Sequence, residues 1–240
     1  MFKAVVKGKA GRIQLENGSS LSWRDLFRKR EDLLTATFFG RLRYLSQAGE
    51  QKVLALLLDQ DAATRAGAIK HIEFWPKFSK EDQGYVEPDV LMICENACVL
   101  VEVKPPFGGD QHIGQWKHEI TQATKEWAAD GLFTGDDQWQ LHFLALGRNV
   151  PEWKVNARSL EEKFSQWKLR VHTQEWLPLR DCIAKICEQE AGRDRFIYQD
   201  WLEALQLFGV SKRLLPFSEM EMMDKVTMDV KHLFMGWEPL

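Results

Sequence analysis

The chain has 240 residues, of which 45% are hydrophobic and 28% are charged, and its formal net charge is −3. This apolar fraction suffices for a packed core, which excludes a disordered tail or a low-complexity scaffold. The near-neutral charge argues against a general nucleic-acid coat and is compatible with a local basic groove.

Cysteine spacing and the absence of long apolar runs indicate a cytoplasmic setting. The four cysteines show no paired C-x-x-C spacing, which argues against a zinc site and a disulfide framework and for a reducing compartment. The first seven residues lack the apolar segment of a signal peptide, and no apolar run approaches the ~18 residues that cross a bilayer. We therefore expect a cytoplasmic protein with no membrane contact.

The N-terminal region predicts a hairpin followed by a helix. Ala4–Val6 and Ile13–Leu15 are short apolar segments around Gly8–Gly11, as in a β-hairpin. Ser22 with Asp25 has the spacing of a capping box, which marks the start of a helix.

Apolar residues then recur at helical spacing to about residue 45, either in one helix or in two that are separated near residues 29–31. Val53–Leu58 is a further helical piece, and Asp59–Gly67 reads as a loop or a helix end.

The middle of the chain changes to short segments rich in branched and aromatic residues, which predict strands. Their order predicts a helical region, three strands, a helix, a strand and then mostly helices, as in an α/β or α+β sandwich. The predicted strands are Ile69–Phe78, Pro88–Cys94, Cys98–Val103, Trp139–Leu146 and Lys168–His172. The predicted helices are residues 113–127, Leu179–Glu190 and Gln199–Leu207, and Lys77–Glu87 is predicted to be a charged loop. The methionine-rich residues 217–240 are predicted to form a helix that packs on the domain or binds a partner.

The segment with the clearest chemistry contains Pro88-Asp89 and Glu102-Val103-Lys104. A two-residue turn between the two strands would place Asp89 opposite Glu102, and a four-residue turn would place Asp89 opposite Lys104. Either register puts all three charged side chains on one face, because side chains alternate along a strand, whereas an odd-length turn would not.

Two carboxylates on directly opposed strand residues have Cβ atoms roughly 4.5–5.5 Å apart and repel each other. A cation between Asp89 and Glu102 would explain their placement, and oxygen ligands suit Mg²⁺ or Mn²⁺. Lys104, on the same face, could orient a water or stabilise charge on a phosphate. The alternative is a solvated ion pair at the end of a strand.

These residues resemble the motif of the PD-(D/E)XK nuclease superfamily, with Pro88-Asp89 as its first half and Glu102-Val103-Lys104 as its second. The resemblance covers about residues 22 to 147. It implies an α/β, restriction-endonuclease-like core with a central mixed sheet flanked by helices. We accordingly expect a nuclease-like domain over residues 1–178, with an N-terminal addition, and a helical C-terminal extension over residues 179–240.

The resemblance also implies a function, the Mg²⁺- or Mn²⁺-dependent hydrolysis of phosphodiester bonds, usually in DNA. Asp89 and Glu102 would bind the metal, and Lys104 would position the attacking water. Family members often add a glutamate from the first core helix, for which Glu31 is the best match and Asp32 the competitor. By analogy, the setting would be prokaryotic defence against foreign DNA or mobile-element processing.

Several further residues have two interpretations. Gln115 either faces the active site, as a glutamine of this helix does in some relatives, or belongs to a polar stripe with Glu119, which we expect at the surface. Basic side chains either contact phosphates or form a solvated face, and the candidates are Arg30, Arg41, Lys77 and Lys80. Because the chain is mildly acidic, a homodimer or a partner protein could supply further basic surface.

Two rival hypotheses remain. The first is a catalytically silent module that uses the same fold to bind DNA or a partner protein. The second is an unrelated α+β protein, which would be indicated if Asp89 and Glu102 lay on opposite faces of the sheet.

Overall fold

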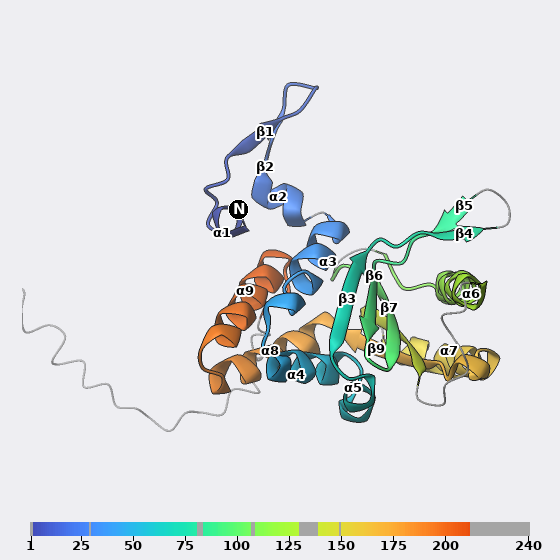
Figure 1. The fold of residues 1–240 in the computed structure, drawn as a ribbon. Helices are drawn as coiled ribbons and strands as arrows, with labels where there is room; N and C mark the ends of the chain where they lie inside the picture. The colour runs from blue at the N-terminus through green and yellow to red at the C-terminus, as the bar shows by residue number, and fades with distance from the viewer. Residues whose placement is uncertain are drawn as a thin grey trace, which may run out of the picture.

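A five-stranded mixed sheet forms the centre of the protein (Figure 1), in the order β3-β6-β7-β8-β9. The computed structural model describes residues 2–28, 30–80, 84–106, 109–129, 139–148 and 150–211. Neighbouring strands are antiparallel from β3 to β7 and parallel from β7 to β9. The strands are β3 (Ile69–Phe74), β6 (Val90–Cys94), β7 (Ala97–Val103), β8 (Gln140–Gly147) and β9 (Arg170–Glu175).

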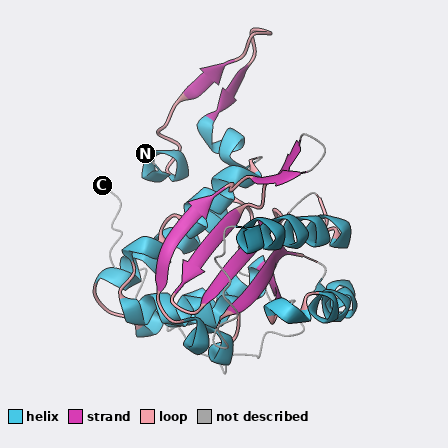
Figure 2. Ribbon diagram, turned by 45° about the vertical axis from the view of Figure 1, so that its right-hand side comes forward, coloured by secondary structure: helices cyan, strands magenta, loops and turns pink. Residues whose placement is uncertain are grey.

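Helices cover both faces of this sheet, so the fold class is α/β, as predicted (Figure 2). One face packs against α3 (Glu31–Phe39), α4 (Gln47–Leu57), α5 (Gln60–Ala66), α8 (Trp176–Gln189) and α9 (Arg193–Leu207). The other face packs against α6 (Ile113–Ala129) and α7 (Val150–Lys163). No helix among the described residues is both long and apolar enough to cross a membrane.

Strand β7 lies at the centre because its sequence is apolar on both faces. All seven of its side chains are buried, as expected for a strand that is covered by helices on both sides. Val99, Val101 and Val103 join the cluster on the α3 side, whereas Cys98 and Leu100 join the cluster on the α6 side. The even-numbered Glu102 therefore points towards α6.

Aromatic side chains fix α3 to the C-terminal helices. The ring of Phe38 stacks on Trp201 with 4.8 Å between centroids and meets Trp176 edge-on at 5.5 Å. The indole Nε1 of Trp201 donates to the backbone oxygen of Phe38 at 2.9 Å. This packing holds the helix whose first residue is Glu31.

The N-terminal prediction was partly wrong. Residues 2–6 form helix α1 (Phe2–Val6), and the hairpin consists of β1 (Arg12–Gln14) and β2 (Ser20–Ser22). The turn sits at Asn17-Gly18, because Gly18 tolerates its φ of 79° and the Asn17 side chain accepts from the Ser19 N–H at 3.0 Å. This hairpin projects from the rest of the molecule (Figure 1).

The predicted helix start is confirmed, and of the two alternatives for the helical region the structure has the one with two helices. The Oγ of Ser22 accepts from the Asp25 N–H at 3.0 Å, and α2 (Trp23–Arg28) ends before α3 begins at Glu31. Residues 60–66, which read as a loop or a helix end, form helix α5, capped by the Asp59 side chain on the Ala62 N–H at 2.7 Å.

The charged loop expected at Lys77–Glu87 contains a second hairpin. Its strands are β4 (Phe78–Lys80) and β5 (Gly84–Val86). Tertiary packing explains it, because Phe78 is buried edge-on against Trp127 of α6 at 5.7 Å. Two short 3₁₀ turns, Leu42–Tyr44 and Ser165–Trp167, complete the described elements.

The expected boundary between residues 178 and 179 falls inside α8. Side chains of α8 and α9 share one hydrophobic cluster with α3, α4 and the sheet. The methionine-rich segment 217–240 lies outside the described residues.

Candidate metal centre

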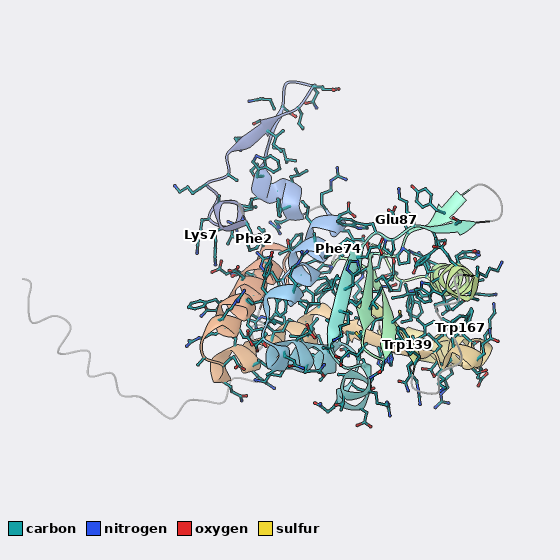
Figure 3. The ribbon with its side chains drawn as sticks, viewed as in Figure 1. Phe2, Lys7, Phe74, Glu87, Trp139 and Trp167 are labelled. Carbon is teal, nitrogen blue, oxygen red and sulfur yellow. The ribbon has the colours of Figure 1, made fainter. Side chains whose placement is uncertain are left out.

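The turn between β6 and β7 sets the register of the candidate site. Val90 pairs with Val101 and Ile93 with Cys98, so the connection is the two-residue turn Glu95-Asn96. This is the first of the two predicted registers, and it places Asp89 across from Glu102, at the end of the sheet where Figure 3 labels Phe74 and Glu87. The two carboxylates therefore lie on the same face of the sheet, so the arrangement that would have indicated an unrelated α+β protein is not found.

Three carboxylates meet at this end of the sheet. Glu31 begins α3, Asp89 directly precedes β6, and Glu102 lies near the end of β7. One oxygen from each residue lies within 4.8 Å of the others, although the residues are distant in sequence. Asp89 is 8% exposed and Glu102 is 2% exposed, so at least two of the three charges are shielded from water.

Lys104 lies among these carboxylates. Its Nζ is 3.2 Å from the Oε1 of Glu31 and also donates to Glu102. Hydrogen bonds also fix the backbone of Lys104. Its backbone oxygen accepts from the Trp176 indole at 2.8 Å, and its backbone N–H donates to the backbone oxygen of Leu146 at 2.7 Å. The ammonium group is thus held at a defined position beside the carboxylates.

Two glutamines of the α6 region support Glu102. The Nε2 of Gln115 donates to the Oε1 of Glu102 at 2.7 Å, so Gln115 faces the site. Gln111 is buried and donates to the backbone oxygens of Glu102 at 3.2 Å and Leu146 at 3.3 Å. The indole of Trp116 holds Gln111 in turn, at 2.7 Å.

Glu119 was expected at the surface, and that prediction was wrong. It is 2% exposed, and its Oε1 accepts from the Nε2 of Gln115 at 2.9 Å. The sequence did contain a signal, because residues four apart on a helix share a face and Glu119 follows Gln115 by four. A fourth carboxyl group therefore adjoins the site.

The surroundings shift the protonation of these groups. Burial, with the nearby Glu102 charge, raises the pKa of Asp89 to about 8. Burial, with the Glu119 charge, raises the pKa of Glu102 to about 8, and burial raises the pKa of Glu119 to about 7. Burial alone would lower the pKa of Lys104, but Glu102 and Glu31 outweigh it and raise that pKa.

The raised pKa values of these carboxyl groups mean that the site holds more negative charge than its buried surroundings can stabilise. A bound cation would reverse these shifts, because it stabilises the ionised carboxylates. Perturbed carboxyl groups gathered in this way are typical of functional sites.

The other residues that the sequence suggested for the site are not part of the carboxylate cluster. Asp32 is exposed, whereas its competitor Glu31 is part of the cluster. Arg30 is exposed directly before Glu31. Arg41 lies beyond the far end of α3, where it binds the Thr37 oxygen at 2.8 Å and Asp200 at 3.5 Å.

The hairpin β4–β5 carries the other two basic candidates. Lys77 is exposed, 3.6 Å from a Glu87 oxygen and 4.6 Å from the centre of the Tyr85 ring. Lys80 ends β4, and its side chain lies outside the described part. The hairpin joins β3 to Asp89, so Lys77 lies on a segment that leads directly into the site.

Comparison with known proteins identifies no family. No family model matches the chain. Over 109 residues the chain is 33% identical to a protein of Pasteurella multocida (strain Pm70) that is named only as uncharacterized. This match covers 43% of the chain and 39% of the relative.

Proposed function

We propose that the chain is a metal-dependent nuclease with a restriction-endonuclease-like, PD-(D/E)XK type core, and that it hydrolyses phosphodiester bonds in DNA. The observation that carries the proposal is the convergence of Glu31, Asp89 and Glu102 within 4.8 Å, with Lys104 bonded to two of them. The pairing of an Asp before one strand with Glu-x-Lys at the end of the next supports the same reading.

The donor set fits a hard divalent cation. Glu31, Asp89 and Glu102 offer carboxylate oxygens, which suit Mg²⁺ or Mn²⁺, and this cluster contains no cysteine or histidine that would favour zinc. These three residues would hold the ion. When bound, such an ion activates a water and neutralises charge on the scissile phosphate.

The chain's own residues supply the rest of the chemistry. Lys104 orients the attacking water and stabilises the negative charge that develops on the phosphate. Gln115 fixes the Glu102 carboxylate, and the Trp176 indole fixes the backbone of Lys104. Each of these bonds sets a reacting group in place before substrate binds.

The surface beside the site is suited to a nucleic acid. Arg30 is an exposed cation that directly precedes Glu31, Lys77 is an exposed cation on the segment that joins β3 to Asp89, and cations bind phosphates without sequence preference. Trp75 and Tyr85 are exposed aromatic side chains on the segment that leads to Asp89, and bases stack on such rings.

Cleavage of supercoiled plasmid and linear DNA, with Mg²⁺ or Mn²⁺ and with EDTA, tests the proposal. We expect metal-dependent cleavage that Lys104→Ala reduces by a factor on the order of 10² or more. Lys70→Ala is the matched control, because Lys70 is an exposed lysine of β3 that pairs with Glu95 at the other end of the sheet.

The two possible failures have different meanings. Absence of both cleavage and Mn²⁺ binding in calorimetry would overturn the proposal and favour the silent binding module. Cleavage that Lys104→Ala leaves intact would show that the activity arises elsewhere or from a contaminant.

A further inference from the structure

The charge of the chain is divided unevenly between its first thirty residues and the rest. Residues 1–30 contain eight Lys or Arg and two Asp or Glu, which gives them a formal charge of +6. Because the whole chain carries −3, residues 31–240 carry −9. Such an asymmetry is typical of proteins whose basic part contacts a nucleic acid. The mild overall acidity therefore conceals one strongly basic segment.

This basic segment folds into an arm that projects from the rest of the molecule (Figure 1). We call residues 2–28 the N-terminal arm, which consists of α1, the hairpin β1–β2 and α2. Its foot is anchored, because Val5 and Phe27 are buried in the cluster that contains α3 and α9. The hairpin itself lies outside this packing, since Ile13 and Leu15 belong to neither hydrophobic cluster and Leu15 is 42% exposed. The surface of the hairpin is thus available to a partner.

Four cations of the N-terminal arm are exposed and form no ion pair with another described residue, namely Lys7, Lys9, Arg24 and Arg28. Arg24 and Arg28 are four residues apart on α2, so they share one face of that helix. Lys3 pairs instead with two carboxylates of α9 at 2.9 Å and 2.7 Å, which helps to anchor the foot of the arm. Unpaired like charges on one small segment repel one another, and a bound polyanion would remove that repulsion.

The N-terminal arm leads directly into the candidate metal centre. Arg28 ends α2 and Glu31 begins α3, so their Cα atoms are at most about 11 Å apart. In Figure 1 and Figure 2 the hairpins β1–β2 and β4–β5 both project at the end of the sheet where β3 ends, which is also the end that carries the carboxylates. A phosphate backbone that is bound at the metal centre would therefore continue past the cations of the arm.

We propose that the N-terminal arm binds duplex DNA beside the metal centre, with Lys7, Lys9, Arg24 and Arg28 on its phosphates. This inference rests on the proposed function, because it assigns a holding surface to the same substrate. The major groove of a duplex admits a two-stranded ribbon, which is the form of the β1–β2 hairpin. A duplex also carries one negative charge per about 1.7 Å of its axis, a denser charge than that of a single strand.

The affinity for a fluorescent duplex of about three helical turns, or ~30 base pairs, tests the inference. The full chain carries Lys104→Ala so that the DNA stays intact, and anisotropy is measured with Mg²⁺ between about 50 and 200 mM salt. Combined Lys7→Gln, Lys9→Gln and Arg24→Gln should weaken binding by a factor on the order of 10 and reduce the slope of log affinity against log salt by about 2 to 3. The same variant should lose less affinity for a single strand of equal length.

A variant that conserves the charges separates phosphate binding from a structural role. Combined Lys7→Arg, Lys9→Arg and Arg24→Lys should keep both the affinity and the salt slope of the parent, because each position retains a cation. In the chain with Lys104 intact, the variant with three glutamines should raise KM for cleavage of the duplex and leave kcat within about twofold, since the arm holds the substrate and takes no part in the reaction.

Combined Arg65→Gln, Lys70→Gln and Arg170→Gln is the matched control. It removes the same charge from exposed cations at the opposite end of the sheet, near the starts of β3 and β9. It should leave the affinity for the duplex and the salt slope unchanged. Thermal unfolding of every variant verifies the fold.

The outcomes separate this inference from the proposed function. Unchanged affinity and slope in the glutamine variant overturn the role of the arm and leave the nuclease proposal standing. An equal loss on the single strand overturns the duplex as the partner. Binding that depends on the arm, without metal-dependent cleavage, supports the arm and overturns the nuclease. A parent chain that binds no duplex overturns the arm, whatever the cleavage assay gives.

Discussion

The backbone N–H of Val103 donates a 2.7 Å hydrogen bond to the Oδ2 of Asp89. Val103 stands between Glu102 and Lys104, so this bond joins the first half of the motif to the second. It also occupies one oxygen of Asp89 and leaves the other for a ligand. The backbone of one hairpin thereby sets the spacing of the site.

Asp89→Asn should stabilise the metal-free chain at neutral and alkaline pH. Burial raises the pKa of Asp89 to about 8, above its ordinary value of about 3.9, so stability is lost as the pH rises through this range. Asparagine carries no charge and still accepts from Val103. In urea unfolding with EDTA at pH 8, we expect a gain on the order of 1–3 kcal/mol that disappears below pH ~4. If Asp89→Asn and the parent chain were equally stable at pH 8, a destabilising buried charge on Asp89 would be contradicted. Glu87→Gln is the control, because Glu87 is an exposed carboxylate near Asp89 in the chain.

Affinity for Mn²⁺ should rise with pH. The pKa values of Asp89 and Glu102 are both raised to about 8 by burial, so below pH 8 the ion must displace protons. We expect the affinity to increase between pH 6 and pH 8 and to level off above it, at about tenfold per unit for each proton released. Calorimetry in buffers of different ionisation enthalpy counts the protons. Affinity independent of pH would show that the carboxylates are already ionised.

The buried His142, which lies beside the half-buried His172, should limit stability in acid. The Nδ1 of His172 lies 2.7 Å from the Leu58 oxygen, which can only accept, so the His172 Nε2 accepts from the Nδ1 of His142 at 3.0 Å. Burial, with the neighbouring His172, lowers the pKa of His142 to about 3. The contribution of the neutral His142 to the free energy of unfolding is therefore fully present above about pH 6.5, the pKa of histidine in the unfolded chain, and is lost as the pH falls towards 3.

His142→Asn, whose amide can replace the bond from Nδ1, should flatten the loss of stability between pH 6.5 and pH 4. Urea unfolding across this range measures the slope. The exposed His118→Asn should leave the slope unchanged. An unchanged slope in His142→Asn would assign the acid sensitivity to other groups.

Gly49→Ala should destabilise the protein. A Cβ at Gly49 would collide with the Oδ2 of Asp194, and that carboxylate also accepts from the Ser46 N–H at 2.9 Å. Displacing Asp194 should cost on the order of 1–3 kcal/mol in the free energy of unfolding. Gly114→Ala on α6 meets no atom within 4 Å and should be neutral or stabilising by up to about 1 kcal/mol. Equal effects in urea unfolding would contradict the close approach at Gly49.

The motif pair could be predicted from the sequence because its geometry is local. The alternation of side chains along one hairpin suffices to predict that an even-length turn brings Asp89, Glu102 and Lys104 to one face, whereas the structure decides that the turn has two residues and that Asp89 lies opposite Glu102. Glu31 could be chosen over Asp32 only by the structure, because the contact depends on how α3 packs through Phe38 against Trp201.

The spacing of four residues places Glu119 on the same helix face as Gln115, but local sequence could not predict that Glu119 is buried, nor that residues 78–86 form a hairpin. The direction in which Glu119 points is set by the packing of α6 on the sheet, through Trp116 and Ile120. The hairpin sequence is polar, and it is held by one aromatic contact between Phe78 and a helix some fifty residues further along the chain. Tertiary contacts decide both.

Tryptophan side chains late in the sequence hold both α3 and the backbone of Lys104, and this affects when the site can form during translation. Glu31 depends on Phe38 packing against Trp201, and the Lys104 carbonyl is held by Trp176. The ribosome makes the motif residues well before either tryptophan emerges. The carboxylates and the ammonium group therefore reach their final positions only after translation has passed α9, and a growing chain carries the motif without an assembled centre.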